Sequence, residues 1–157
     1  MVFKSLSAFI LFFAFSHLCN AQNFSEKQSP LASYIQKKYQ SAPFEGVKII
    51  ESDEGAYLVS LAIVNVASHK TQSTMNRVAT IKARRSAMIY LQGSTITSES
   101  ILTTSEKVSS NSVTYYENYM DKISENAGGF VDGMATLTTF KTNKGRDYVY
   151  VAYKLLN

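Results

Sequence analysis

The sequence predicts an α+β fold with a mainly antiparallel sheet and helices layered on one face. Strand pairs joined by tight turns occupy both ends of the domain, at 46–66 and 130–156, and tight hairpins join antiparallel strands. Between them lie an alanine-rich helical segment at 75–93 and a polar helical segment at 113–129. Hairpins at both ends imply a mainly antiparallel sheet with helices layered on one face, which is an α+β arrangement.

The first 21 residues have the layout of a secretory signal peptide, which the mature chain would lack. Lys4 precedes an apolar run from Leu6 to Phe15, and the cleavage site lies after Ala21. The apolar run is shorter than the roughly 20 residues that a helix needs to cross a bilayer. We therefore expect a secreted or periplasmic protein with no transmembrane span.

The only cysteine, Cys19, lies inside this leader. A lipoprotein would be cut just before the cysteine, after small residues, but His17 and Leu18 occupy those positions. We expect no lipid anchor at Cys19. Cleavage after Ala21 also removes every thiol, which excludes disulfides, thiol catalysis and thiolate zinc sites and leaves the core to hold the fold alone.

Residues 22–28 are expected to form a flexible polar lead-in, followed by a single α+β domain over 29–157. Ser29 and Pro30 are typical of a helix start and predict a short amphipathic helix over about 30–40. Strands are expected at 46–52 and 56–66, with the acidic turn between them.

The main helix is predicted to begin after Ser73 or Thr74 and to end at Gly93. Helical periodicity predicts one broad apolar face and a neighbouring strip of small residues that allows close approach to the sheet. The broad face comprises Met75, Val78, Ile81, Met88 and Ile89, and the strip comprises Ala79, Ala83 and Ala87.

Four further elements complete the predicted order. A strand is expected from Thr95 to about Thr104, then a helix that Gly128 and Gly129 stop. The final hairpin pairs 130–142 with 146–156. In its second strand Tyr148, Tyr150 and Ala152 should face one way, and Val149, Val151 and Tyr153 the other.

The run ATIKARRSAMIYLQGSTITSES at 79–100, with GGFVDG at 128–133 and the closing YVYV, resembles small bacterial envelope proteins grouped with the twenty-kilodalton surface lipoprotein, which have flagellar-assembly relatives. The resemblance covers roughly 75–153. It implies an envelope or surface role, often in assemblies, and transfers no catalytic residues. Members are often lipoproteins, and His17-Leu18 departs from that feature.

Candidate chemistry in the sequence is sparse. The net charge of +4 is spread along the chain, so we expect no nucleic-acid partner. His69 lies in a polar loop, and no Gly-x-Ser-x-Gly motif accompanies it. Glu117, Asp121 and Glu125 step by four along a predicted helix; they suit a solvated face better than paired acids of a hydrolase or a calcium site.

Four residues are the predicted candidates for a protein interface. Arg85 suits an acidic partner group, and tyrosines combine apolar area with a hydroxyl. The tyrosines are Tyr148, Tyr150 and Tyr153, in a segment that also suits an edge strand open to pairing with a partner.

The sequence thus favours a non-enzymatic binding or assembly module of the bacterial envelope, with protein partners or self-association and without a cofactor, metal site or catalytic residue. The alternatives are a small extracytoplasmic hydrolase or inhibitor that uses the Glu117/Asp121/Glu125 face, and a carrier of a small apolar ligand.

Overall fold

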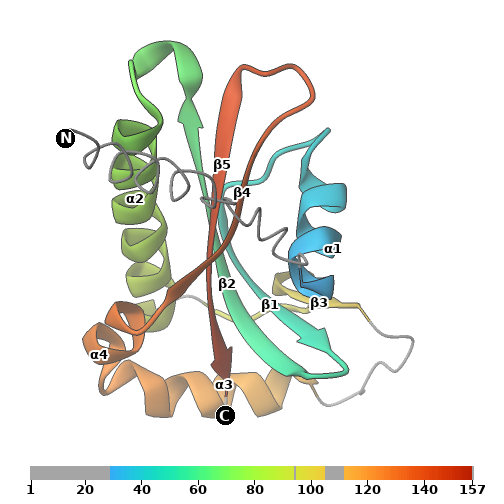
Figure 1. Cartoon of the computed structure of the whole chain (residues 1–157). Helices are drawn as coiled ribbons and strands as arrows, with labels where there is room; N and C mark the ends of the chain where they lie inside the picture. Colours follow the sequence, from blue (N-terminus) through green and yellow to red (C-terminus); the bar gives the residue numbers. More distant parts are fainter. Residues whose placement is uncertain (1–28, 94, 105–111, 157) are drawn as a thin grey trace, which may run out of the picture.

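The computed structural model describes residues 29–93, 95–104 and 112–156 (Figure 1). The predicted signal peptide, the lead-in and Cys19 lie outside these residues. Five strands form one sheet in the order β3-β1-β2-β5-β4. They are β1 (Gly46–Ser52), β2 (Gly55–Asn65), β3 (Ile101–Thr103), β4 (Ala135–Lys141) and β5 (Asp147–Leu156). All neighbours are antiparallel except β1 and β3, which are parallel.

The helices lie on both sides of this sheet (Figure 1). They are α1 (Pro30–Tyr39), α2 (Gln72–Gly93), α3 (Ser112–Ser124) and α4 (Ala127–Asp132), with short 3-10 turns η1 (Val66–Ser68) and η2 (Ser98–Ser100). Helices α2, α3 and α4 pack on one face, and α1 covers part of the other. The α+β class and the mainly antiparallel sheet are confirmed, with α1 as the helix outside the predicted layer.

The first hairpin and α1 form as predicted. Ser29 Oγ accepts a hydrogen bond from Ala32 N (3.2 Å), and Pro30 begins the helix. Strands β1 and β2 pair in register from Gly46 to Ser52. At the turn, Gly55 has φ 134°, and a Cβ there would lie 3.0 Å from Leu155 Cδ1, so this position requires glycine.

Helix α2 corrects two predictions. It begins at Gln72, and its cap is Thr71, whose Oγ1 accepts from Thr74 N (3.2 Å), rather than Ser73 or Thr74. Its buried face is the alanine strip extended by Met75 and Leu91. Ile81 and Ile89, predicted on the core face, are 60% and 58% exposed.

The reason is the close approach of α2 to the sheet. Ser60 of β2 is fully buried and donates from Oγ to the Ala83 carbonyl at 2.8 Å. Only small side chains fit where a helix backbone lies within hydrogen-bond reach of a strand side chain. The alanine strip therefore takes the core position, and Ile81 and Ile89 turn outward.

The strand predicted for Thr95–Thr104 is mostly not a strand. Ser98–Ser100 is a 3-10 turn, and β3 covers only Ile101–Thr103. The Ser100 hydroxyl donates to the Thr97 carbonyl (2.6 Å), and Thr97 N donates to Ser100 Oγ (3.0 Å). These local hydroxyl bonds hold the backbone in a turn and compete with strand pairing.

The helix predicted over 113–129 is divided in two. Helix α3 ends at Ser124, and Asn126 caps α4 by accepting from Gly129 N (3.2 Å). Gly128 and Gly129, predicted as a stop, lie inside the first turn of α4. Because α4 continues to Asp132, β4 begins at Ala135 and not at Phe130.

Strand β5 is an interior strand, paired with β2 on one side and β4 on the other. The interpretation of this segment as an open edge strand is therefore wrong. Its predicted alternation is confirmed, since Tyr148, Tyr150 and Ala152 belong to the core under α2, and Val149 and Val151 to the core under α1. In the residues described, no helix is long and apolar enough to span a membrane.

Candidate functional site

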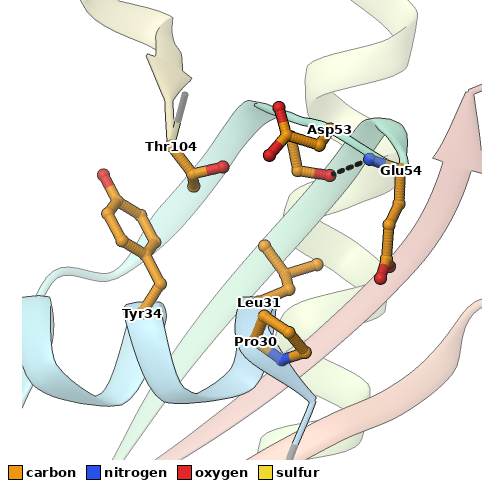
Figure 2. Close-up of a pocket in the computed structure, with 7 residues that line it drawn as sticks. Pro30, Leu31, Tyr34, Asp53, Glu54 and Thr104 are labelled. Carbon is orange, nitrogen blue, oxygen red and sulfur yellow. Dashed lines mark hydrogen bonds between the residues drawn. The ribbon is translucent and has the colours of Figure 1, made fainter. Parts of the chain in front are cut away.

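The candidate site is a pocket of about 320 Å³ between the start of α1 and the β1–β2 turn (Figure 2). We call it the turn pocket. Figure 2 shows Pro30, Leu31 and Tyr34 on one side and the acidic turn on the other. Its lining residues are Pro30, Leu31, Tyr34, Ser52, Asp53, Glu54 and Thr104.

Local hydrogen bonds fix the acidic side of the pocket. Ser52 Oγ accepts from Glu54 N (3.3 Å) and donates to the Gly55 carbonyl (3.1 Å). A serine hydroxyl favours such a turn because it bonds to backbone groups of neighbouring residues. The bonds leave the exposed side chains of Asp53 and Glu54 at the tip of the hairpin, next to α1.

The third side of the pocket is Thr104, which follows β3. Its N–H and its hydroxyl both donate to the Glu51 carbonyl, at 2.8 and 3.0 Å. The aliphatic hydroxyls of the pocket, on Ser52 and Thr104, are thus engaged in backbone bonds.

The carboxylates of Asp53 and Glu54 are the anionic groups of the turn pocket, and Tyr34 adds a hydroxyl. Within the described ranges, neither Asp53 nor Glu54 has a cation within ion-pair distance. Burial raises the pKa of the Tyr57 hydroxyl, and the negative charge of nearby Glu54 raises it further. Leu31 is buried and supplies an apolar wall. Two carboxylates, an aromatic ring and an apolar wall suit an amine or guanidinium with an aliphatic stem.

Behind the turn pocket, Glu51 joins three elements. Its carboxylate accepts from Tyr116 Oη on α3 (2.8 Å) and from Thr103 Oγ1 on β3 (3.1 Å). Burial is the main cause that raises the pKa of Tyr116, and the hydrogen bond to Glu51 adds to it. Tyr116 therefore stays protonated as the donor.

A second cavity, of about 420 Å³, lies between the end of α2 and α3. Glu117 and Asp121 line it, and Glu125 lies in the turn that follows α3. All three predicted acids are exposed. Among the residues described, no group of three His, Cys, Asp or Glu side chains is placed to hold a metal ion.

Tyr90 also lines this second cavity. Its hydroxyl oxygen is buried and has no well-formed hydrogen bond within the described part of the chain, although Ser100 lies near. Burial raises the pKa of Tyr90, and Ser100 opposes this shift.

The structure does not bring the predicted interface residues together. Tyr148 and Tyr150 are 2% and 6% exposed; Tyr148 Oη donates to Asn76 Oδ1, and the hydroxyls of Tyr150 and Thr136 are 2.7 Å apart. These two tyrosines therefore belong to the core under α2. Tyr153 is half-buried on the opposite face of the sheet, and Arg85 is exposed on α2.

His69 is half-buried just after η1, where its backbone N–H bonds to the Val66 carbonyl (3.3 Å). The sequence did not predict the turn pocket as a site, because it indicates only a turn at Asp53-Glu54 and a helix at Tyr34.

Compared with protein families, curated proteins and solved structures, the chain shows no significant match.

Proposed function

We propose that the chain is an exported, non-enzymatic binding module of the bacterial envelope whose turn pocket takes a positively charged side chain of a protein partner. The observation that carries this proposal is the pair Asp53 and Glu54, which has no cation partner in the described residues and borders a half-apolar pocket of about 320 Å³. The leader-like N-terminus and the resemblance to envelope proteins support the compartment.

The chemistry of the pocket supports a basic side chain as the bound group. The aliphatic stem of lysine or arginine would lie along Leu31 and Pro30 while its charge reaches the carboxylates. Exposed ion pairs contribute only about 0–1 kcal/mol each. The pocket alone therefore binds weakly, and it serves as one contact within a larger protein interface.

The geometry favours the hydrolase alternative less. A glycosidase needs one carboxyl group held protonated in an apolar environment, whereas Glu117, Asp121 and Glu125 are all exposed. The apolar-carrier alternative needs space between helix and sheet, and there the Ser60 hydroxyl already contacts the α2 backbone at 2.8 Å.

NMR titration with arginine amide and lysine amide tests the pocket, with norleucine amide as a neutral probe. We expect shifts at Glu54 and Thr104 with the two cationic probes only. The double substitution Asp53→Asn/Glu54→Gln should weaken binding by up to about tenfold, while Glu117→Gln/Asp121→Asn should not. Equal binding of norleucine amide, or an unchanged affinity in the pocket variant, would contradict the proposal.

Export is tested by intact mass and N-terminal sequencing of the mature protein from its host. We expect a chain that begins at Gln22 and lacks Cys19. A chain that begins at an acylated Cys19 would show a membrane-tethered protein, and an intact Met1 would remove the export proposal.

A further inference from the structure

The outward side of α2 carries an unusual combination of aliphatic and basic residues. Ile81 and Ile89 are 60% and 58% exposed, and Arg85 lies between them at four-residue spacing on the same side. Arg77 is also exposed, one turn toward the start of the helix. We call these four residues the outer α2 face.

All the charged side chains of α2 have the same sign. The helix contains four basic residues, Arg77, Lys82, Arg84 and Arg85, and no acidic one. Lys82 is used internally, because its Nζ contacts Glu45 (2.7 Å) and the Ile63 carbonyl (2.7 Å). Arg84 approaches Asp132 (3.9 Å). Over the ranges that the structure describes, Arg77 and Arg85 have no ion pair.

A surface of opposite character lies on α3. Glu117, Asp121 and Glu125 follow one side of this helix and its end, and the first two line the cavity of about 420 Å³. The three acids and the cavity together form what we call the acidic α3 face.

We infer that copies of this chain associate head to tail, with the outer α2 face of one copy against the acidic α3 face of the next. The two surfaces have opposite charge, Ile81 and Ile89 are exposed on the first, and the cavity on the second offers room for an arginine side chain. In Figure 1, α2 runs along one side of the sheet and α3 crosses its end. Within the described residues, no ion pair joins the two helices.

Charge also favours head-to-tail association over a symmetric contact between two outer α2 faces. A contact between two outer α2 faces would place Arg77 and Arg85 of both copies against one another, and like charges at short range repel. Contact between two different surfaces repeats from copy to copy, so it gives a ring or an open chain.

The predicted contact is weak. The outer α2 face runs from Arg77 to Ile89, which at 1.5 Å per residue gives about 20 Å. A strip this long and about 10 Å wide presents roughly 200 Å², whereas a stable interface buries about 800 Å² on each partner. We therefore expect association that depends on concentration and falls with added salt.

Sedimentation velocity of the mature full-length protein over a concentration series tests this inference. We expect the weight-average sedimentation coefficient to rise with concentration. The variants Arg77→Glu/Arg85→Glu and Glu117→Lys/Asp121→Lys should each remain monomeric. Their equimolar mixture should associate again, because each variant then meets the complementary charge of the other.

Two controls separate this inference from the proposed pocket. Arg146→Glu, an exposed charge change in the β4–β5 turn, and the pocket variant Asp53→Asn/Glu54→Gln should associate like the wild type. Wild type that stays monomeric at all concentrations, or a variant mixture that stays monomeric, would overturn the inference. A monomeric wild type that binds phosphatidylglycerol vesicles through Arg77 and Arg85 would overturn it in favour of a lipid surface.

Discussion

Glu51 shows how one residue ties together segments that are distant in the sequence. Its carboxylate accepts from Tyr116 and Thr103, and its backbone carbonyl accepts twice from Thr104. These bonds anchor β3 and α3 to the end of β1. Strand β3 has only three residues, and these bonds add to the parallel pairing with β1 that holds it in place.

Replacement of Tyr116 by phenylalanine tests this junction. Loss of its hydrogen bond to Glu51 should lower the free energy of unfolding at pH 7 by about 1–2 kcal/mol. The pKa of Tyr116 is raised in the folded protein. Its proton therefore stabilises the fold fully below pH 10, and this contribution is lost as the pH rises above the unfolded value toward the folded one.

Urea unfolding between pH 7 and pH 11 measures both effects. Above pH 10 the wild type should lose stability more steeply than Tyr116→Phe, since the variant has no hydroxyl to ionise. Tyr115→Phe, on the exposed side of α3, is the matched control and should behave like the wild type. Parallel slopes for Tyr116→Phe and wild type would disprove this role.

Ser60 provides a second test at residue scale, because it is a fully buried hydroxyl between β2 and α2. Ser60→Ala removes its hydrogen bond to the Ala83 carbonyl and should cost about 1 kcal/mol. Ser60→Val adds bulk where helix and sheet are closest and should cost more, about 1–3 kcal/mol from overpacking. Chemical denaturation of the two variants checks the order, and a more stable Val variant would contradict the close-contact explanation.

At the scale of elements, the sequence predicted those parts whose signals are local. The start of α1 follows from Ser29 and Pro30, and the last turn uses Gly145 at φ 64°. The long helix and the alanine strip that approaches the sheet were predicted correctly, but Ile81 and Ile89 were wrongly placed on the core face. Both sides of α2 contain apolar residues, and periodicity alone cannot decide between large and small ones.

The choice between the two sides of α2 depends on the sheet beneath it. Tyr148 and Tyr150 fill the space under α2, so the helix contacts the sheet through alanines. The turn pocket was equally unpredictable, because it exists only where α1 docks beside the β1–β2 turn. Both arrangements depend on contacts between elements that are distant in the sequence, so no single segment predicts them.

Two substitutions on α2 distinguish its sides directly. Ala83→Leu should destabilise the protein by about 1–3 kcal/mol or more, because the fully buried site has no room. Ile81→Gln should change stability by less than about 0.5 kcal/mol, since the side chain is 60% exposed. Thermal or urea unfolding checks both, and the opposite order would show that the sequence-predicted face is the buried one.

At the scale of the whole molecule, one sheet separates two hydrophobic cores. Alternate residues of β2 and β5 belong to the core under α2 and to the core under α1. The smaller core is closed by Leu31, Ile35 and Tyr39 of α1. Because both cores share the same two central strands, loss of one exposes a face of the strands on which the other depends.

This shared sheet predicts that α1 unfolds together with the rest of the domain. Ile35 is fully buried, so Ile35→Ala should lower the free energy of unfolding by about 2–5 kcal/mol. Ile89→Ala removes the same atoms from an exposed site and should cost less than about 0.5 kcal/mol.

The chain has ten tyrosines and no tryptophan, so tyrosine fluorescence and far-UV circular dichroism serve as two probes of unfolding. In the Ile35 variant the two transitions should coincide at a lower urea midpoint, as in two-state unfolding. A separate early transition, with hydrogen exchange accelerated only in α1, would instead show that α1 opens independently and that the sheet is stable on the α2 core alone.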